Sequence, residues 1–211
     1  MPKEYQSAKL RQCKKKLSLN TCFSLNILSL SFSSLTRMKH LAKLEIMFCE
    51  QLGKLEVSLD ECQISNNRDF TTHDFFHSLI RNVVIWGCGF LDATWLIYAP
   101  RLQKLTIVEC NMEAILSDHY HQDIFSNLET LHLQTLSNLR SICPKALPFP
   151  ALIEIHVNQC PILEKLPLNA TSANGLKQIR GEASRWNRLH WEDMATKDAF
   201  RSKFTEVPNY V

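Results

Sequence analysis

Residues 99–116 read APRLQKLTIVECNMEAIL and carry the pattern on which the rest of the chain is built. The apolar side chains fall at Leu102, Leu105 and Ile107 before Cys110, and they return at Met112 and Ile115. Leu105-Thr106-Ile107 alternates like a short strand with one buried face. One such strand cannot fold alone, because its apolar face needs a neighbour. The stretch therefore predicts further copies of itself.

The same spacing recurs along the chain when the copies are aligned on the cysteine, a position that we call the slot. The slot residues are Cys22, Cys49, Cys88, Cys110, Leu136, Cys160 and Ser184. Successive slots lie 27, 39, 22, 26, 24 and 24 residues apart, and most intervals fall in the range of ~20–29 residues that is typical of leucine-rich repeats. The longest interval indicates an insertion or one unrecognised repeat. We predict a leucine-rich-repeat solenoid of the α/β class, with a parallel β-sheet on the concave side and an irregular or short-helical convex side.

Composition limits the possible functions. The chain has 211 residues, 45% of them hydrophobic, with 5 glycines and a net charge of +3. So few glycines argue against a hairpin-rich fold and against glycine-rich phosphate loops, and the near-balanced charge predicts no strong attraction to nucleic acid or to a membrane surface. A repeat array of this length forms one elongated body whose units contact mainly their neighbours.

The eight cysteines favour reduced thiols over a disulfide framework. Five of them occupy the slot, where cysteine acts as a small buried hydrophobe, and Leu136 fills the same slot in another repeat. No Cys-x-x-Cys pair occurs, and zinc needs about four converging ligands. The spacings His73-x-x-x-His77 and Asp118-His119-Tyr120-His121 lack a third and fourth ligand, so solvated loops are favoured there. We predict no metal and no cofactor.

The regions outside the regular repeats differ in character. Residues 1–16 are a polar, basic lead-in without a secretory signal, and no apolar run approaches the ~20 residues that span a bilayer, so a cytoplasmic location is expected. Residues 17–183 form the predicted array, with an irregular insertion near 59–78. Residues 184–211 form a Trp/Phe-rich carboxyl-terminal cap, because a solenoid must close its open end with an atypical unit. Within the cap, Ala195–Phe204 is expected to be a short helix.

Three segments together resemble the carboxyl end of plant coiled-coil nucleotide-binding leucine-rich-repeat disease resistance proteins. They are residues 40–49 (HLAKLEIMFC), residues 91–100 (LDATWLIYAP), and the run from Ile179-Arg-Gly-Glu182 through Trp186, Leu189, Trp191, Thr196-Lys197 and Phe200. The family commonly has paired tryptophans in the last segment, and here the pair is Arg185-Trp186. The family also carries an ATP/ADP-binding switch preceded by a coiled coil, but no Gly-x-x-x-x-Gly-Lys-[Ser/Thr] motif occurs here. The resemblance implies an effector-sensing, autoinhibitory repeat domain detached from that switch, as a fragment, a truncated paralogue or an incomplete gene model.

The residues between the buried positions of each strand are expected to line the concave face and to bind a protein partner. Those singled out are Glu45, Met47, Val84, Trp86, Lys104, Thr106, Val108, His132, Gln134, His156, Asn158 and Arg180. Met47, Val84, Trp86 and Val108 would form an apolar patch, and tryptophan is a favoured interface anchor. The alternative is that the 59–78 insertion covers Trp86. His132 and His156 share one column, where a surface ladder is favoured over a metal or pH-sensing role.

These observations support a protein-recognition and regulatory module of plant immunity. Its expected partner is a pathogen effector, a guarded host protein or the nucleotide-binding domain of a resistance protein. The alternative is a substrate-receptor subunit of a ubiquitin ligase, but residues 1–16 are too short and too polar for the helical adaptor that such receptors carry. An enzyme is not expected, because no paired acid/base site and no nucleophile motif occurs.

Overall fold

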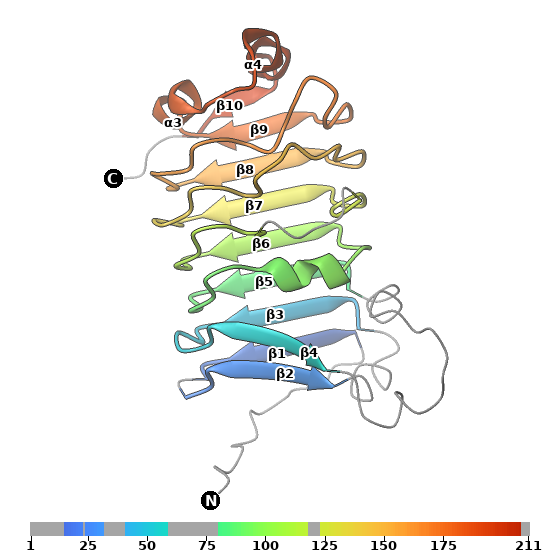
Figure 1. The fold of residues 1–211 in the computed structure, drawn as a ribbon, viewed down its shortest axis with the longest axis vertical. Helices are drawn as coiled ribbons and strands as arrows, with labels where there is room; N and C mark the ends of the chain where they lie inside the picture. Colours follow the sequence, from blue (N-terminus) through green and yellow to red (C-terminus); the bar gives the residue numbers. More distant parts are fainter. Residues whose placement is uncertain (1–14, 23, 32–40, 59–79, 118–122, 208–211) are drawn as a thin grey trace, which may run out of the picture.

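Parallel strands stacked in a single ladder form the body of the chain (Figure 1). The computed structural model describes residues 15–22, 24–31, 41–58, 80–117 and 123–207. The ladder follows the order β1 (Lys16–Asn20), β3 (Lys43–Met47), β5 (Asn82–Trp86), β6 (Lys104–Val108), β7 (Thr130–Gln134), β8 (Glu154–Asn158), β9 (Gln178–Gly181) and β10 (Phe204–Glu206). Each turn of the chain adds one strand beside the last, so the predicted leucine-rich-repeat solenoid is confirmed.

The strand register aligns the second and fourth residue of each strand into inward-facing columns. Leu105, for example, pairs with Val83 on one side and Leu131 on the other, and all three are buried. The alternating apolar pattern thus becomes one continuous core along the solenoid axis. Because the side-chain period of a strand is two, the first, third and fifth residues face the other way.

The slot cysteines have a structural role beyond filling space. The thiols of Cys49, Cys110 and Cys160 each donate to the carbonyl oxygen two residues earlier, at Sγ–O distances of 3.4, 3.3 and 3.4 Å. The residue between each pair is in the left-handed region, as at Glu109 with φ 52°. The thiol therefore caps a sharp turn that ends each strand. Among the described residues, the slot residues Cys22, Cys49, Cys88, Cys110 and Cys160 are free thiols, as the slot pattern predicts.

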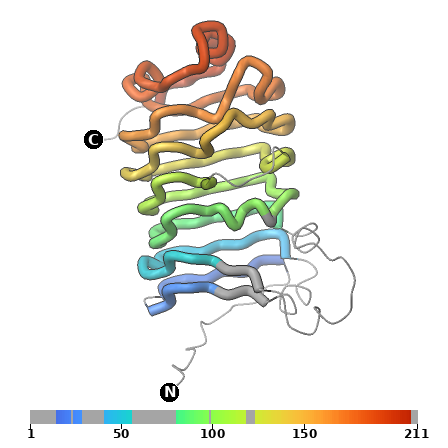
Figure 2. Tube along the Cα trace, in the orientation of Figure 1, coloured from blue at the N-terminus to red at the C-terminus, as the bar shows by residue number. Residues whose placement is uncertain are grey.

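The side opposite the ladder is mostly irregular, as expected. Strands β2 (Ile27–Ser31) and β4 (Lys54–Ser58) pair in parallel there, a short 3-10 helix η2 (Thr94–Tyr98) lies along the next turn, and isolated bridges link later turns. Figure 2 shows the chain returning along this side between successive strands. The insertion predicted near residues 59–78 falls outside the described residues.

The last segment covers the end of the array with two helices and a strand. They are α3 (Ala183–Arg188), α4 (Met194–Arg201) and β10. The helix expected at Ala195–Phe204 is present, but its predicted end is wrong because Phe204 begins β10, which pairs in parallel with β9. That pairing satisfies backbone groups that an open sheet edge would leave exposed. The Asp193 carboxylate starts α4 by accepting the backbone N–H of Thr196 at 2.6 Å.

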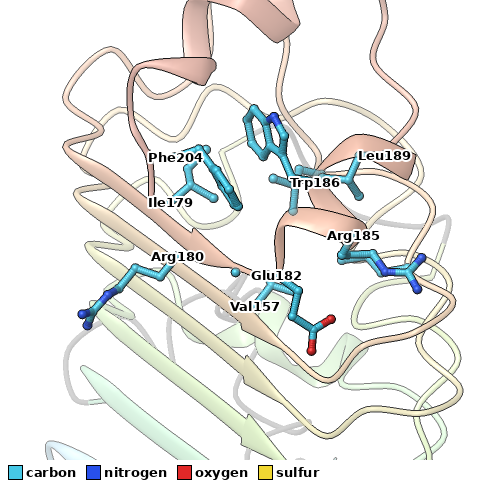
Figure 3. A pocket seen from close by; sticks show the side chains of 11 residues that line it. Val157, Ile179, Arg180, Glu182, Arg185, Trp186, Leu189 and Phe204 are labelled. Carbon is cyan, nitrogen blue, oxygen red and sulfur yellow. The ribbon is translucent and has the colours of Figure 1, made fainter. Parts of the chain in front are cut away.

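Trp186 lies at the centre of this covering segment. Its ring stacks on Phe204 with centroids 4.6 Å apart and lies 4.8 Å from the ring of Trp191. Figure 3 shows Trp186, Leu189 and Phe204 gathered beside Ile179 of the last full repeat. The rings of Trp186, Trp191 and Phe204 thus cover the apolar column that a further repeat would otherwise bury.

A close backbone approach at Gly89 gives a testable prediction of stability. A β-carbon at Gly89 would lie 2.2 Å from the carbonyl oxygen of Glu50, whereas one at Gly175 would meet nothing nearer than 3.7 Å. Gly89→Ala should therefore destabilise the chain by about 1–3 kcal/mol or more, because a backbone oxygen must shift. The matched substitution Gly175→Ala should be close to neutral in urea unfolding. Equal midpoints for the two variants would show that the turns do not approach as described.

Candidate protein-recognition surface

The outward-facing residues of the ladder form three columns, which together we call the sheet face. The central column contains Ser18, Glu45, Val84, Thr106, His132, His156 and Arg180. The column at the strand ends contains Asn20, Met47, Trp86, Val108, Gln134 and Asn158, and Lys104 belongs to the column at the strand starts. The structure thus brings all the predicted contact residues onto one face. Whether they bind a partner remains a prediction.

Glu45 differs from the expectation of an accessible contact residue. It is only 6% exposed, because its carboxylate pairs with the Lys16 ammonium at 2.5 Å and the Lys43 ammonium at 2.7 Å. Burial alone would raise the pKa of Glu45, but hydrogen bonds and charge from the two lysines outweigh it and lower that pKa. Glu45 therefore joins the first two strands of the ladder and leaves the lysine side chains as the accessible groups.

This ion pair predicts a pH-dependent stability. Replacing Glu45 with glutamine should cost about 1 kcal/mol at pH 7, since the lysine partners are themselves partly solvated. The pKa of Glu45 is lower in the folded chain than in the unfolded one. Its stabilisation is therefore complete above the unfolded value of about 4.3 and is lost as the pH falls through the folded value. Urea unfolding of both chains from pH 7 to pH 3 should show the gap closing, and a gap independent of pH would exclude the mechanism.

An exposed aromatic pair stands where β3 and β5 end. Trp86 is 37% exposed and Phe48 is 43% exposed, and their ring centroids lie 5.2 Å apart. The indole N–H of Trp86 donates to the Glu109 carboxylate at 2.9 Å. Val108, which pairs with Trp86 in the register, is 9% exposed although it is not part of the core cluster. The apolar patch thus presents the rings of Trp86 and Phe48, while Val108 on the adjacent strand is almost buried.

Phe48 was missed from the sequence. It follows the strand directly, in the left-handed conformation with φ 54°, so the two-residue alternation does not say which way its side chain points. The signal available was its position before a slot cysteine. The suggestion that the 59–78 insertion covers Trp86 concerns residues outside those described.

A histidine pair lies farther along the central column. The rings of His132 and His156 stack with centroids 4.4 Å apart, and neither buried Nε2 atom has a hydrogen-bond partner among the residues that the structure describes. Burial, then the neighbouring His132 and Arg180, lower the pKa of His156, while Glu154 opposes them. Arg180 lies 3.9 Å from the Glu154 carboxylate. This part of the face is a stacked, partly buried ladder, as the sequence favoured.

A metal centre needs clustered ligands, and a small-molecule site needs a pocket. In the described ranges, no group of three or more His, Cys, Asp or Glu side chains is arranged to hold a metal. The cavity beneath the cap in Figure 3 measures about 20 Å³, room for about one water molecule. A more open hollow of about 440 Å³ lies behind the cap, between Lys145, Lys165 and Trp191. Within the part of the chain that the structure describes, no helix is long and apolar enough to cross a membrane.

Comparisons with known proteins identify relatives of this chain. No family model matches the chain. Disease resistance protein RPS5 of Arabidopsis thaliana is 35% identical over 178 residues, which cover 79% of this chain and 20% of that protein. Disease resistance protein SUMM2 of the same plant is 34% identical over 179 residues, with 79% and 20% covered. Disease resistance protein UNI is 34% identical over 135 residues, with 59% and 15% covered.

The chain is a homologue of plant disease resistance proteins. The resemblance expected from the repeat and cap segments is thereby confirmed, and a role connected with plant defence is supported. The chain spans about a fifth of the length of these resistance proteins. The relatives are named as disease resistance proteins, and nothing in the comparisons favours the ubiquitin-ligase alternative.

Proposed function

We propose that this chain is a protein-recognition and regulatory repeat domain in plant defence, and that its sheet face contacts the partner. The observation that carries the proposal is that two exposed aromatic side chains, Phe48 and Trp86, lie with ring centroids 5.2 Å apart at the ends of the adjacent strands β3 and β5. Exposed apolar side chains scattered singly need no explanation, but touching aromatic rings on a rigid sheet favour an interface. The homology to resistance proteins supplies the biological setting.

The proposed partner is a protein in the plant cytoplasm. It is a pathogen effector, a guarded host protein, or the nucleotide-binding domain of a resistance protein, in which case the contact restrains that domain. A rigid ladder suits each of these roles, because its outward side chains are held by the backbone and lose little freedom on binding. No catalytic step is part of the proposal.

A retention experiment tests this function. The purified chain and its variant Trp86→Ala/Val108→Asp are immobilised and exposed to the same leaf extract, and the retained proteins are identified by mass spectrometry. The parent chain should retain at least one protein whose retained amount is at least tenfold lower on the variant. Trp86→Ala alone should also reduce the retained amount of that protein, but by a smaller factor, because it removes only one surface ring.

Two controls make the outcome decisive. Ile153→Ala removes an exposed apolar side chain (40% exposed) that precedes β8, and it should retain the same proteins as the parent. Circular dichroism melting must show that every variant is folded at the binding temperature. If the folded double variant retains the same proteins as the parent, the sheet face is not the recognition surface.

A further inference from the structure

We propose that the ridge formed by Phe48, Trp86 and Glu109 binds an arginine-bearing segment of a protein partner, with aliphatic side chains beside the arginine. This inference rests on the proposed function and deepens it, because it states what the partner must present. The ridge stands at the edge where β3, β5 and β6 end. Three independent observations on that edge support the proposal.

The first observation is that Phe48 adopts an uncommon backbone conformation although its side chain remains exposed. Its φ is 54°, and the same left-handed position is taken in other turns by Thr21, Gly87, Glu109, Thr135 and Gln159. A bulky residue is uncommon in this region, where glycine fits without strain. Phe48 nevertheless remains 43% exposed, so the fold gains little burial in return. The turn requires the left-handed backbone at this position, but it does not require an aromatic side chain there, which favours a role for the Phe48 ring in contact with a partner.

The second observation is that the ridge is preorganised. The indole N–H of Trp86 is fixed on the Glu109 carboxylate at 2.9 Å, and the ring of Phe48 lies beside it. Gly87 makes room for this arrangement, because a β-carbon there would lie 3.2 Å from Cδ1 of Phe48. A tryptophan ring held in place by both neighbours loses little freedom when a ligand stacks on it.

The third observation is the distribution of charge along these strands. In the six residues after each of β3, β5 and β6 the charged residues are Glu50, Asp92, Glu109 and Glu113, with no lysine or arginine. At the opposite ends of the same strands stand Lys43, Arg81 and Lys104. The next cation after Glu50 in the chain, Lys54, begins β4 in the other sheet. The aromatic ridge therefore lies at strand ends that are followed within six residues by acidic side chains and by no cation.

Aromatic faces beside a carboxylate match the chemistry of a guanidinium group. Arginine stacks flat on tryptophan through cation–π attraction and donates hydrogen bonds in its plane to carboxylate oxygens. Glu109 is exposed, and a carboxylate accepts about four hydrogen bonds, so the one from the indole leaves capacity for a ligand. The exposed ring of Phe48 then receives an aliphatic neighbour of the arginine.

Peptide binding to the whole purified chain tests this chemistry. The probes are the fluorescein-labelled peptide GLRLRLG and its counterpart GLELELG, titrated by fluorescence anisotropy at low salt. The arginine peptide should bind at least tenfold more tightly than the glutamate peptide, and 0.5 M NaCl should reduce the difference. Equal binding of the two peptides would overturn the proposal.

Three variants separate the ridge from general attraction. Phe48→Gly removes the ring yet suits the left-handed backbone, so it should weaken arginine-peptide binding about tenfold without loss of stability. Glu109→Gln keeps an acceptor for the indole but removes the charge, and it should reduce the preference for arginine. Ile162→Ala, another exposed apolar residue (39% exposed) after a strand end, should change nothing. Unaltered binding by folded Phe48→Gly would also overturn the proposal.

The outcomes distinguish this inference from the function on which it rests. If leaf proteins are retained in a Trp86-dependent manner but the peptides show no charge preference, the arginine assignment is wrong and the recognition function stands. If the retained proteins do not depend on Trp86, the proposed recognition face itself is wrong, whatever the peptides show.

Discussion

Replacing Trp186 with alanine is expected to lower the free energy of unfolding by about 3–5 kcal/mol, the usual cost of removing a large buried aromatic side chain. Trp186 is 6% exposed and contacts both Phe204 and Trp191. Its loss should open the covering segment over β9. In a repeat array each unit depends on its neighbours, so the last repeat should loosen as well. Urea unfolding followed by circular dichroism measures the change.

The control for Trp186 lies in the same segment. Met194 begins α4 and is 68% exposed, so Met194→Ala should change the free energy of unfolding by no more than about 0.5 kcal/mol. A Trp186→Ala chain as stable as the Met194→Ala chain would mean that residues 184–206 do not cover the end of the array.

Replacing Leu133 with alanine is expected to cost about 2–5 kcal/mol, because the cavity left in a close-packed core is only partly filled by relaxation. Leu133 is fully buried in β7 and pairs with Ile107 and Val157 on the adjacent strands. It also joins the two halves of the array, so the unfolding transition should broaden as their coupling weakens.

The neighbouring position in β7 supplies the control for Leu133. Gln134 faces outward and is partly exposed, so Gln134→Ala should stay within about 0.5 kcal/mol of the parent. If Leu133→Ala unfolded at the same urea concentration as the parent, the strand register would be wrong.

The repeat period was sufficient to predict the architecture. Leu105, Ile107 and Cys110 recur with nearly fixed spacing, and a parallel ladder is the arrangement that buries all copies at once. The same period also predicts which residues form the outward-facing columns, because the alternation of side chains is a local property of each strand. The tryptophans after the last repeat predicted the covering segment for a similar reason, because the final apolar column cannot stay exposed.

Features set by contacts between different turns could not be predicted from the period. The burial of Glu45 depends on lysines from two adjacent strands, and the low exposure of Val108 depends on its neighbours on the face. Phe48 takes its direction from a left-handed turn, which no spacing of apolar residues encodes. Phe204 was expected to end a helix, yet pairing with the open edge of β9 makes it a strand.

In this solenoid the slot thiols point inward and are not bridged, which leaves the interleaved side chains accessible to a partner. Burial raises the pKa of Cys110 and of Cys160 to about 11, so near pH 8 both are protonated as well as enclosed, and only thiolates react readily. Site-resolved iodoacetamide labelling measured by mass spectrometry, without reductant, tests this directly. Cys110 and Cys160 should remain unlabelled in the folded chain and label fully in guanidinium. Rapid labelling of the folded chain, or labelling in guanidinium only after a reductant is added, would contradict the account.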